Sequence, residues 1–270
     1  MKQQIRSLSF ILGILILSSC TEKIDIDLNS SDPQIVIQGS ISNSGLPSII
    51  SITASVNYDE SNDFPKVEGA MVSLIDNLGN SVVLPETSPG IYSSSTITGT
   101  IGNTYFLTVE TDGKTLTSNS TVPNQVPFDS LIVEVNTSTG GGFGPDGESS
   151  SHYVKVQYQD PAEETNYYRF VEYVNGEFKK SYVYDDRLSN GLFVTQDLIR
   201  SNRNLSPGDT LKIEMQCVDF FVYDYFFSFG NLFGGPTNSS TPSNPNTNIS
   251  GSELGYFSAH TFELKYDVIQ

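Results

Sequence analysis

The 270-residue chain is poor in the side chains that carry most protein chemistry, with two cysteines, two histidines and no tryptophan. It is also poor in positive charge, because 14 lysines and arginines are outnumbered by 31 aspartates and glutamates. Phosphate backbones are bound through clustered basic side chains, so we expect no nucleic acid among the partners. The same balance argues against a basic patch on anionic lipid, and any membrane attachment would need another device.

The few histidines and cysteines are placed unfavourably for catalysis. His152 and His260 lie far apart inside strand-like stretches, and neither has a metal-ligand neighbour at helical or loop spacing. Cys217 ends the stretch 211–217, where alternate residues are apolar, which predicts a buried structural thiol and not a nucleophile. Motifs of hydrolases, zinc proteases and nucleotide-binding loops are also missing. We therefore expect no enzyme, metal or cofactor; an enzyme would have to use a carboxylate pair.

A long run of apolar residues lies near the start of the sequence. Residues 8–17 are almost entirely apolar and follow the basic residues Lys2 and Arg6, which is typical of a signal peptide. A spanning helix needs roughly 20 apolar residues, so this run is too short to cross a bilayer. Leu17-Ser18-Ser19-Cys20 follows directly and resembles the bacterial lipobox. We predict a signal peptide at 1–19; the alternative is cleavage elsewhere, with Cys20 an ordinary residue.

Cleavage before Cys20 predicts a palmitate-type lipid anchor on that residue, inserted in the bilayer. Each buried CH₂ group contributes about 0.8 kcal/mol and a single chain binds reversibly, so multiple acylation gives a lasting anchor. Residues 20–32 are polar and few, as expected of a lipidated tether. Loss of residues 1–19 leaves 12 basic and 31 acidic residues, a formal charge of −19. An acylated Cys20 also leaves Cys217 without a disulfide partner.

The rest of the chain is typical of an all-β protein. Stretches rich in β-branched and aromatic residues alternate with Gly, Asn, Asp and Pro turns. We predict strands at 34–41, 48–57, 70–75, 104–110, 115–122, 130–136, 152–159, 167–174, 177–184, 210–218 and 261–269. About seven short strands in roughly 100 residues is the size of one antiparallel sandwich.

Two prolines in Val122-Pro123-Asn124-Gln125-Val126-Pro127 predict a domain boundary, because they cannot lie in a central strand. We expect an N-terminal β-sandwich at 33–123 and a C-terminal β-rich domain at 124–270. The fold class is thus all-β, with two antiparallel β-sandwich-like domains. The loops 137–151 and 234–252 are too long for hairpins and rich in Gly, Ser, Asn and Pro. They are mobile or, if they order, they are where a partner makes contact.

Residues 219–230 break the strand pattern. They carry seven aromatic side chains, begin with an aspartate that suits an N-cap and end on glycine, which predicts a short aromatic-rich helix in the second domain. Aromatic residues on nearly every face favour a helix packed across that domain's core. The alternative is a stacking or partner-contact surface formed by Phe220, Tyr223, Tyr225 and Phe227.

Acidic clusters at 59–63, 146–148 and 185–186 could supply oxygen ligands for Ca²⁺. None reproduces the twelve-residue calcium loop with its terminal glutamate, so we interpret them as solvated surface acids.

Two short motifs, Asp129-Ser130-Leu131 and Asp209-Thr210-Leu211, resemble the three-residue O-glycosylation signal of exported Bacteroidetes proteins. The resemblance implies glycans on Ser130 and Thr210.

A set of segments across the mature chain resembles the Bacteroidetes lipoprotein family called domain of unknown function 4249. The segments are 20–28, 35–41, 69–76, 90–92, 102–109, 122–131 and 248–259. The resemblance implies an outer-membrane lipoprotein, typically encoded beside a TonB-dependent receptor, and no established catalytic residues. The segment 69–76 with the following Gly-x-Tyr and Gly-x-Thr-Tyr motifs also resembles an immunoglobulin-like sandwich module, which implies that type for the first domain.

Two functions follow as expectations. The first is a non-catalytic accessory or binding subunit of a TonB-dependent uptake system, and the second is a surface adhesin or structural envelope module. Lys23 interrupts the acid-rich export tether of the family, so the sequence leaves both the cell surface and the periplasmic side open. A small-molecule or glycan ligand is not identified by any motif.

Overall fold

The computed structural model describes residues 32–57, 60, 61, 63–136, 152–200, 204–232, 244–252 and 254–270. The signal peptide, Cys20, the tether up to residue 31, the loop 137–151 and residues 233–243 of the second predicted loop lie outside the described residues, as do the acidic cluster 146–148 and residues 59 and 62. Apart from Asp32 and Asn57, the described residues form one compact unit.

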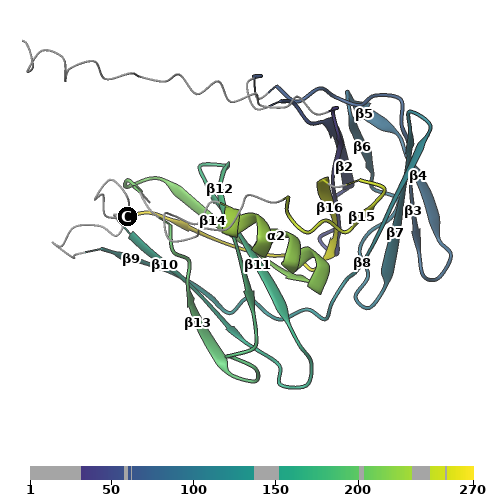
Figure 1. Cartoon of the computed structure of the whole chain (residues 1–270). Helices are drawn as coiled ribbons and strands as arrows, with labels where there is room; N and C mark the ends of the chain where they lie inside the picture. Colours follow the sequence, from purple (N-terminus) through teal and green to yellow (C-terminus); the bar gives the residue numbers. More distant parts are fainter. Residues whose placement is uncertain are drawn as a thin grey trace, which may run out of the picture. The chain divides into compact units, whose positions relative to one another are not determined.

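The first sandwich is made of two five-stranded sheets around one hydrophobic core (Figure 1). One sheet contains, in spatial order, β16 (Leu254–His260), β1 (Ile35–Ser42), β2 (Ser48–Ala54), β6 (Ile91–Ser94) and β5 (Glu86–Ser88). The other contains β15 (Ile249–Ser250), β8 (Lys114–Thr121), β7 (Thr104–Thr111), β3 (Met71–Asp76) and β4 (Ser81–Leu84). Alternation along β7 buries Tyr105, Leu107 and Val109, as the sequence predicts.

The second sandwich has a three-stranded and a four-stranded sheet around a separate core. The smaller sheet contains β13 (Phe193–Asp197), β10 (His152–Gln159) and β9 (Ser130–Val135), in that order. The larger sheet contains β12 (Glu177–Asp185), β11 (Tyr167–Val174), β14 (Thr210–Val218) and β17 (Glu263–Val268). The predicted all-β class with two sandwiches is confirmed, and all eleven predicted strands are present.

The late strands β15 and β16 belong to the first sandwich, although they lie far beyond the boundary predicted after residue 123. β16 pairs with β1 in parallel, and β15 pairs with β8. The first sandwich therefore combines residues from both sides of that boundary. The segment 248–259 was singled out in the sequence only by resemblance; its pairing partner is more than 200 residues away, which no local pattern reveals.

The predicted helix is α2 (Phe220–Leu232), which packs on β11 and β12 of the larger sheet (Figure 1). Asp219 caps it, because its Oδ1 accepts a hydrogen bond of 3.0 Å from the Val222 amide. Its Oδ2 accepts further bonds from the Ser120 hydroxyl and the Thr121 amide of β8. Among the described residues, no helix is both long and apolar enough to cross a membrane.

Candidate functional site

Four aromatic rings of the helix α2 and one ring of β11 form a continuous row that we call the aromatic ladder: Phe221, Phe220, Tyr167 of β11, Tyr223 and Phe227. Ring centroids are 5.6 Å apart for Phe221 and Phe220, and 5.6 Å for Phe220 and Tyr167. The row continues from Tyr167 to Tyr223 at 4.9 Å and from Tyr223 to Phe227 at 5.5 Å. These spacings lie in the favourable range for aromatic pairs, so the rings support one another.

The ladder is open to solvent at its phenylalanines. Phe220, Phe221 and Phe227 are 48%, 58% and 44% exposed, while Tyr223 is buried. The Tyr223 hydroxyl donates a 2.8 Å hydrogen bond to Asp185, and burial together with this carboxylate raises the pKa of Tyr223 to about 12. The ladder is thus an apolar surface that is fixed from beneath by a polar contact.

The opposite side of α2 packs around a half-buried arginine. The Arg169 guanidinium carbon lies 3.9 Å from the centroid of the Phe226 ring, and one of its nitrogens donates a 3.0 Å bond to Gln216. Tyr256 of β16 contacts Phe226 at a ring-centroid distance of 4.8 Å. The Arg169 Nε is buried and has no hydrogen-bond partner among the described residues, and burial lowers the pKa of this arginine. A cation stacked on rings holds the helix against the sheet.

The four residues predicted as a contact surface divide into two pairs. Phe220 and Phe227 are exposed, whereas Tyr223 and Tyr225 are buried. One face of the helix therefore packs on the sandwich, as one interpretation predicted, and the other face is uncovered by described residues. Partner contact at that face stays a prediction. Tyr167 and Arg169 were not predicted as parts of this site, although a pattern in the sequence places them there. They alternate with the core residues of β11 and must therefore face the other side of the sheet.

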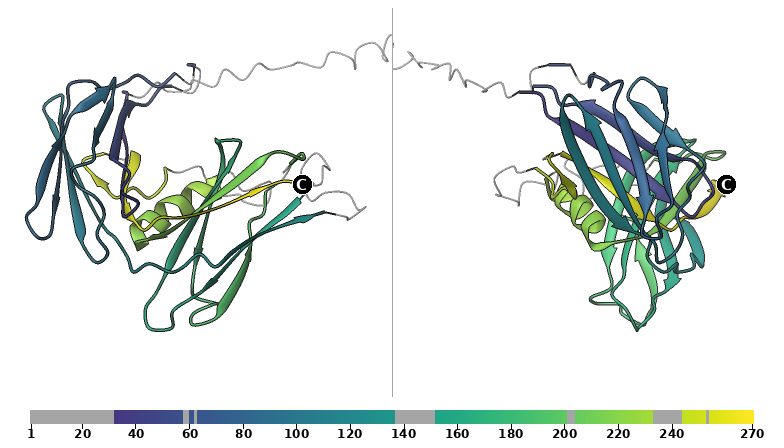
Figure 2. Two further views of the ribbon diagram at one scale, coloured as in Figure 1. Left: turned by 180° about the vertical axis from the view of Figure 1, so that it is seen from behind. Right: turned by 90° about the vertical axis from the view of Figure 1, so that its right-hand side faces the viewer.

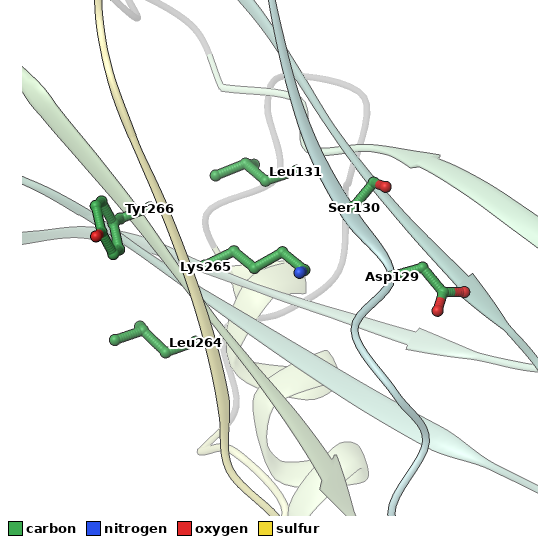
Figure 3. A pocket seen from close by; sticks show the side chains of 6 residues that line it. All are labelled: Asp129, Ser130, Leu131, Leu264, Lys265 and Tyr266. Carbon is green, nitrogen blue, oxygen red and sulfur yellow. The ribbon is translucent and has the colours of Figure 1, made fainter.

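A hollow of ≈ 390 Å³ opens between the edge strands β9 and β17 (Figure 3). Ser130 and Leu131 of β9 and the preceding Asp129 line one side, and Leu264, Lys265 and Tyr266 of β17 line the other. Lys265 points across the hollow toward β9, whereas Leu264 and Tyr266 point to the other side of β17 (Figure 3). A single lysine on an edge strand is a common protection against sheet-to-sheet association.

The two predicted glycan acceptors have different surroundings. Ser130 is half-buried at the start of β9 and lines the hollow, while Thr210 is exposed at the start of β14. Asp209, which precedes Thr210, accepts bonds from the Asn175 amide and the Ser206 backbone, and these bonds lower its pKa. Thr210 is the more accessible of the two hydroxyls, and glycosylation of either stays a prediction.

A second hollow of ≈ 370 Å³ lies in the first sandwich beside Asp76 and Tyr105. The Asp76 carboxylate accepts bonds from the amides of Leu78 and Asn80 and from the Asn80 side chain. The side-chain bond from Asn80 is the largest cause that lowers the pKa of Asp76. This carboxylate therefore holds a turn and is not free to act on a ligand.

The thiol and imidazole groups are ill suited to catalysis. Cys217 is buried, as predicted, and burial raises its pKa, which disfavours the reactive thiolate. His260 is buried beside Ser258, and burial with the nearby Arg169 lowers its pKa to about 3. In the part of the chain that the structure describes, no three His, Cys, Asp or Glu side chains gather as metal ligands.

Buried acids in the second sandwich are held by protein donors. Glu172 is fully buried and forms a 3.0 Å ion pair with Arg200, while the Tyr182 hydroxyl donates to its other oxygen at 2.7 Å. Asp185 of the acidic pair accepts from Arg187 at 2.9 Å and from Tyr223, and Asp186 accepts from the Asn166 amide at 2.8 Å. Such paired groups stabilise one arrangement of the core and leave little free capacity for a cation.

A family model described as Domain of unknown function (DUF4249) matches residues 21–265, which is most of the chain. The chain belongs to the DUF4249 family. No curated protein matches it. A two-domain fibronectin type-III segment of chicken tenascin is similar at 15% identity and a TM-score of 0.22, covering 72% of this chain and 91% of that chain. The sandwich fold of this DUF4249 protein rests on its own sheet topology.

Residues that carried the DUF4249 resemblance have structural roles. The Tyr92 hydroxyl accepts a 2.9 Å bond from the Ala70 amide and donates to the Val67 carbonyl at 3.1 Å. Tyr105 bridges Thr98 and Thr100 in the same way at 2.8 and 2.9 Å. The segment Leu254–His260 forms β16. These contacts fix loops to the first sandwich, so Tyr92 and Tyr105 stabilise its fold.

Proposed function

We propose that this DUF4249 protein is a non-catalytic outer-membrane lipoprotein, anchored through an acylated Cys20, that serves as a binding subunit of a TonB-dependent uptake system. The observation that carries the binding role is the exposed aromatic ladder on α2. Large apolar patches on a folded surface mark interaction sites, and aromatic residues dominate the energetics of such contacts. The partner in this proposal is an apolar surface of the receptor barrel.

Other observations support the non-catalytic and anchored parts of the proposal. The Cys217 thiol and the His260 imidazole are both buried; burial raises the pKa of the thiol, which disfavours the thiolate, and lowers the pKa of the imidazole, which makes it a weak base. The family match begins at residue 21, directly after Cys20, which fits a mature chain that starts at the lipid-bearing cysteine. The formal charge of −19 of the mature chain suits a protein that touches its partner through apolar contacts and not through bound polyanions.

Affinity purification from detergent-solubilised outer membranes, read by mass spectrometry, tests the binding role. We expect a TonB-dependent barrel to co-purify with the wild-type chain and to be lost with the double variant Phe220→Ser, Phe227→Ser. Phe193→Ser is the matched control, because Phe193 is similarly exposed on β13, away from the helix. The control should retain the barrel.

The surface-adhesin alternative predicts a different result. Purifications that contain no barrel with any of the three chains, together with a deletion strain that attaches poorly but takes up substrate normally, would favour the adhesin and contradict the uptake proposal.

A further inference from the structure

Strand β1 is the first strand after the tether, and it is bonded along both of its edges. Its register with β16 runs in parallel from Val36 opposite Leu254 to Ser42 opposite His260. Its register with β2 is antiparallel and extends from Ile35 to Ser40. Figure 2 (left) shows the purple β1 beside the yellow β16. The tether therefore leads into a strand that cannot leave the sheet without breaking two ladders.

The parallel orientation of β1 and β16 decides how tension would act on them. The chain enters β1 at one end of the pair and leaves β16 at the other end, beside Ser42. Directly after β16, Thr261 is bonded to Cys217 of β14 through its hydroxyl at 2.9 Å and through its amide at 3.2 Å. The exit of β16 is thus fixed to the second sandwich.

A pull between the tether and the second sandwich therefore acts along the two strands, from opposite ends. In this shear geometry, the evenly spaced hydrogen bonds of a parallel pair carry the load together. A pull applied at the same end of both strands would instead break the bonds one after another. We propose that the β1–β16 pair is a mechanical clamp, which keeps the protein folded when its anchored end is pulled against a partner held on the second sandwich. Only the origin of the force rests on the function proposed above.

The outer edge of β16 is sealed by side chains, so the strand is held from both sides. The Asn248 side chain donates a 2.7 Å bond to the Phe257 carbonyl and accepts a 2.9 Å bond from the Phe257 amide. This amide group substitutes for a neighbouring strand. The Ser120 hydroxyl accepts from the Ala259 amide at 2.8 Å. These bonds oppose the displacement of β16 away from β1.

Packing at the pair keeps water from its hydrogen bonds. Ile37 and Ile41 of β1 and Phe257 and Ala259 of β16 are fully buried in the first core. At the entry end, the Ser252 hydroxyl donates a 2.6 Å bond to the carbonyl of Ile35. Because water competes poorly for buried backbone groups, the ladder loses its bonds only when the strands slide.

Single-molecule force spectroscopy of the full-length chain, carrying Cys20→Ala, tests the clamp with two placements of handles. In the shear placement the handles are on Asp32→Cys and Leu264→Cys, four residues beyond β16. In the peeling placement they are on Asp32→Cys and Ser250→Cys, four residues before β16. Leu264 and Ser250 are both exposed, and the buried Cys217 does not compete for the handles.

We expect the unfolding force in the shear placement to be several-fold higher than in the peeling placement. Equal forces, or a lower force in shear, would overturn the proposal. Neither lipid nor receptor is present, so this outcome is independent of the co-purification result.

A pair of asparagine variants tests the sealed edge. Asn248→Ala should lower the shear force, since it frees the outer edge of β16. Asn246→Ala is the matched control, because Asn246 lies two residues away but bonds to Asp224 and Ser228 of α2. A shear force that is lowered equally by both variants, or by neither, would contradict the role assigned to the edge.

Discussion

His260 shows how one buried side chain couples the stability of this protein to pH. The imidazole is fully enclosed, with Ser258 Oγ at 2.9 Å from its Nδ1 and the Arg169 cation nearby. Burial first, and then the arginine, lower its pKa to about 3, so it is neutral in the folded chain at neutral pH. In the unfolded chain the same group becomes charged below about 6.5.

Because folding lowers the pKa of His260, the folded protein loses stability as the pH falls. The stability contribution of His260 is complete above about pH 6.5 and is lost as the pH falls toward 3, because the unfolded chain binds the proton first. We expect the free energy of unfolding to fall by on the order of 3 kcal/mol between pH 7 and pH 4 from this residue alone. Urea unfolding of wild type and His260→Gln at both pH values measures it. Carboxylates with lowered pKa values, such as Asp76, contribute equally to the pH dependence of both proteins, so their effect cancels in the comparison. If the free energy of unfolding of wild type and His260→Gln depends on pH to the same extent, the assignment to His260 is contradicted.

Among the strands, β16 depends on a glycine at its second residue. Gly255 has a φ of +101°, and a Cβ placed there would lie 1.9 Å from the carbonyl oxygen of Ile37. No side chain can be accommodated, because the obstacle is backbone. We expect Gly255→Ala to destabilise the protein by about 3 kcal/mol or more in urea unfolding.

The control for Gly255 is a glycine in the helix. Gly230 lies in α2 without a positive φ, and nothing is within 4 Å of a Cβ there. Gly230→Ala should be stabilising by roughly 0.5–1 kcal/mol, since alanine favours helices. A similar loss for both variants would show that the close approach of β16 to β1 is not what requires Gly255.

The N-cap residue of α2, Asp219, is the basis of a second prediction about a single element. Asp219 accepts bonds from the helix and from Ser120 and Thr121 of β8, so it connects the helix to the first sandwich. We expect Asp219→Ala to cost about 2 kcal/mol, measured by thermal unfolding. Asp224→Ala is the control inside the same helix, as its carboxylate bonds only to the exposed Asn246 among the described residues. A larger loss from the control would refute this role of the cap.

At the scale of the whole molecule, the proposed acyl anchor on Cys20 is the feature that would hold the protein at the membrane. We expect Cys20→Ala to move the chain from the membrane to the soluble fraction, as followed by fractionation and immunoblotting. Cys217→Ala keeps the lipobox and should stay in the membrane fraction. Persistence of the Cys20→Ala chain in membranes would mean that something other than acyl chains holds it.

Several parts of the fold could be predicted because their signals are local. Alternation in β7 fixes which residues face the core, and the aspartate before Phe220 and the glycine near its end delimit α2. The burial of Cys217 follows from the alternation in β14. Each of these patterns lies within about a dozen consecutive residues, so it can be recognised from the sequence alone.

The short strands β4, β5, β6, β13 and β15 were not predicted, because a few residues hardly show a period of two. The seven-residue β16 was not predicted either, because most of its residues are buried and do not alternate in exposure. For the site, the aromatic content of 219–230 pointed to the right helix but could not tell which rings are exposed. Phe220 and Phe227 remain open whereas Tyr223 and Tyr225 are buried, because β11 and β16 cover only one side.

The sequence by itself determined the all-β class, the position of the helix, the buried thiol and the strong expectation of a lipid anchor at Cys20. Only the tertiary structure decided that β16 returns to β1, where Ser252 bonds to Ile35 across 217 positions of sequence. The physical reason is that the alternation of side chains within a strand shows which face is buried. The neighbouring strand is instead bound through backbone N–H and C=O groups, which are the same in every sequence, so the sequence of one strand does not identify its partner.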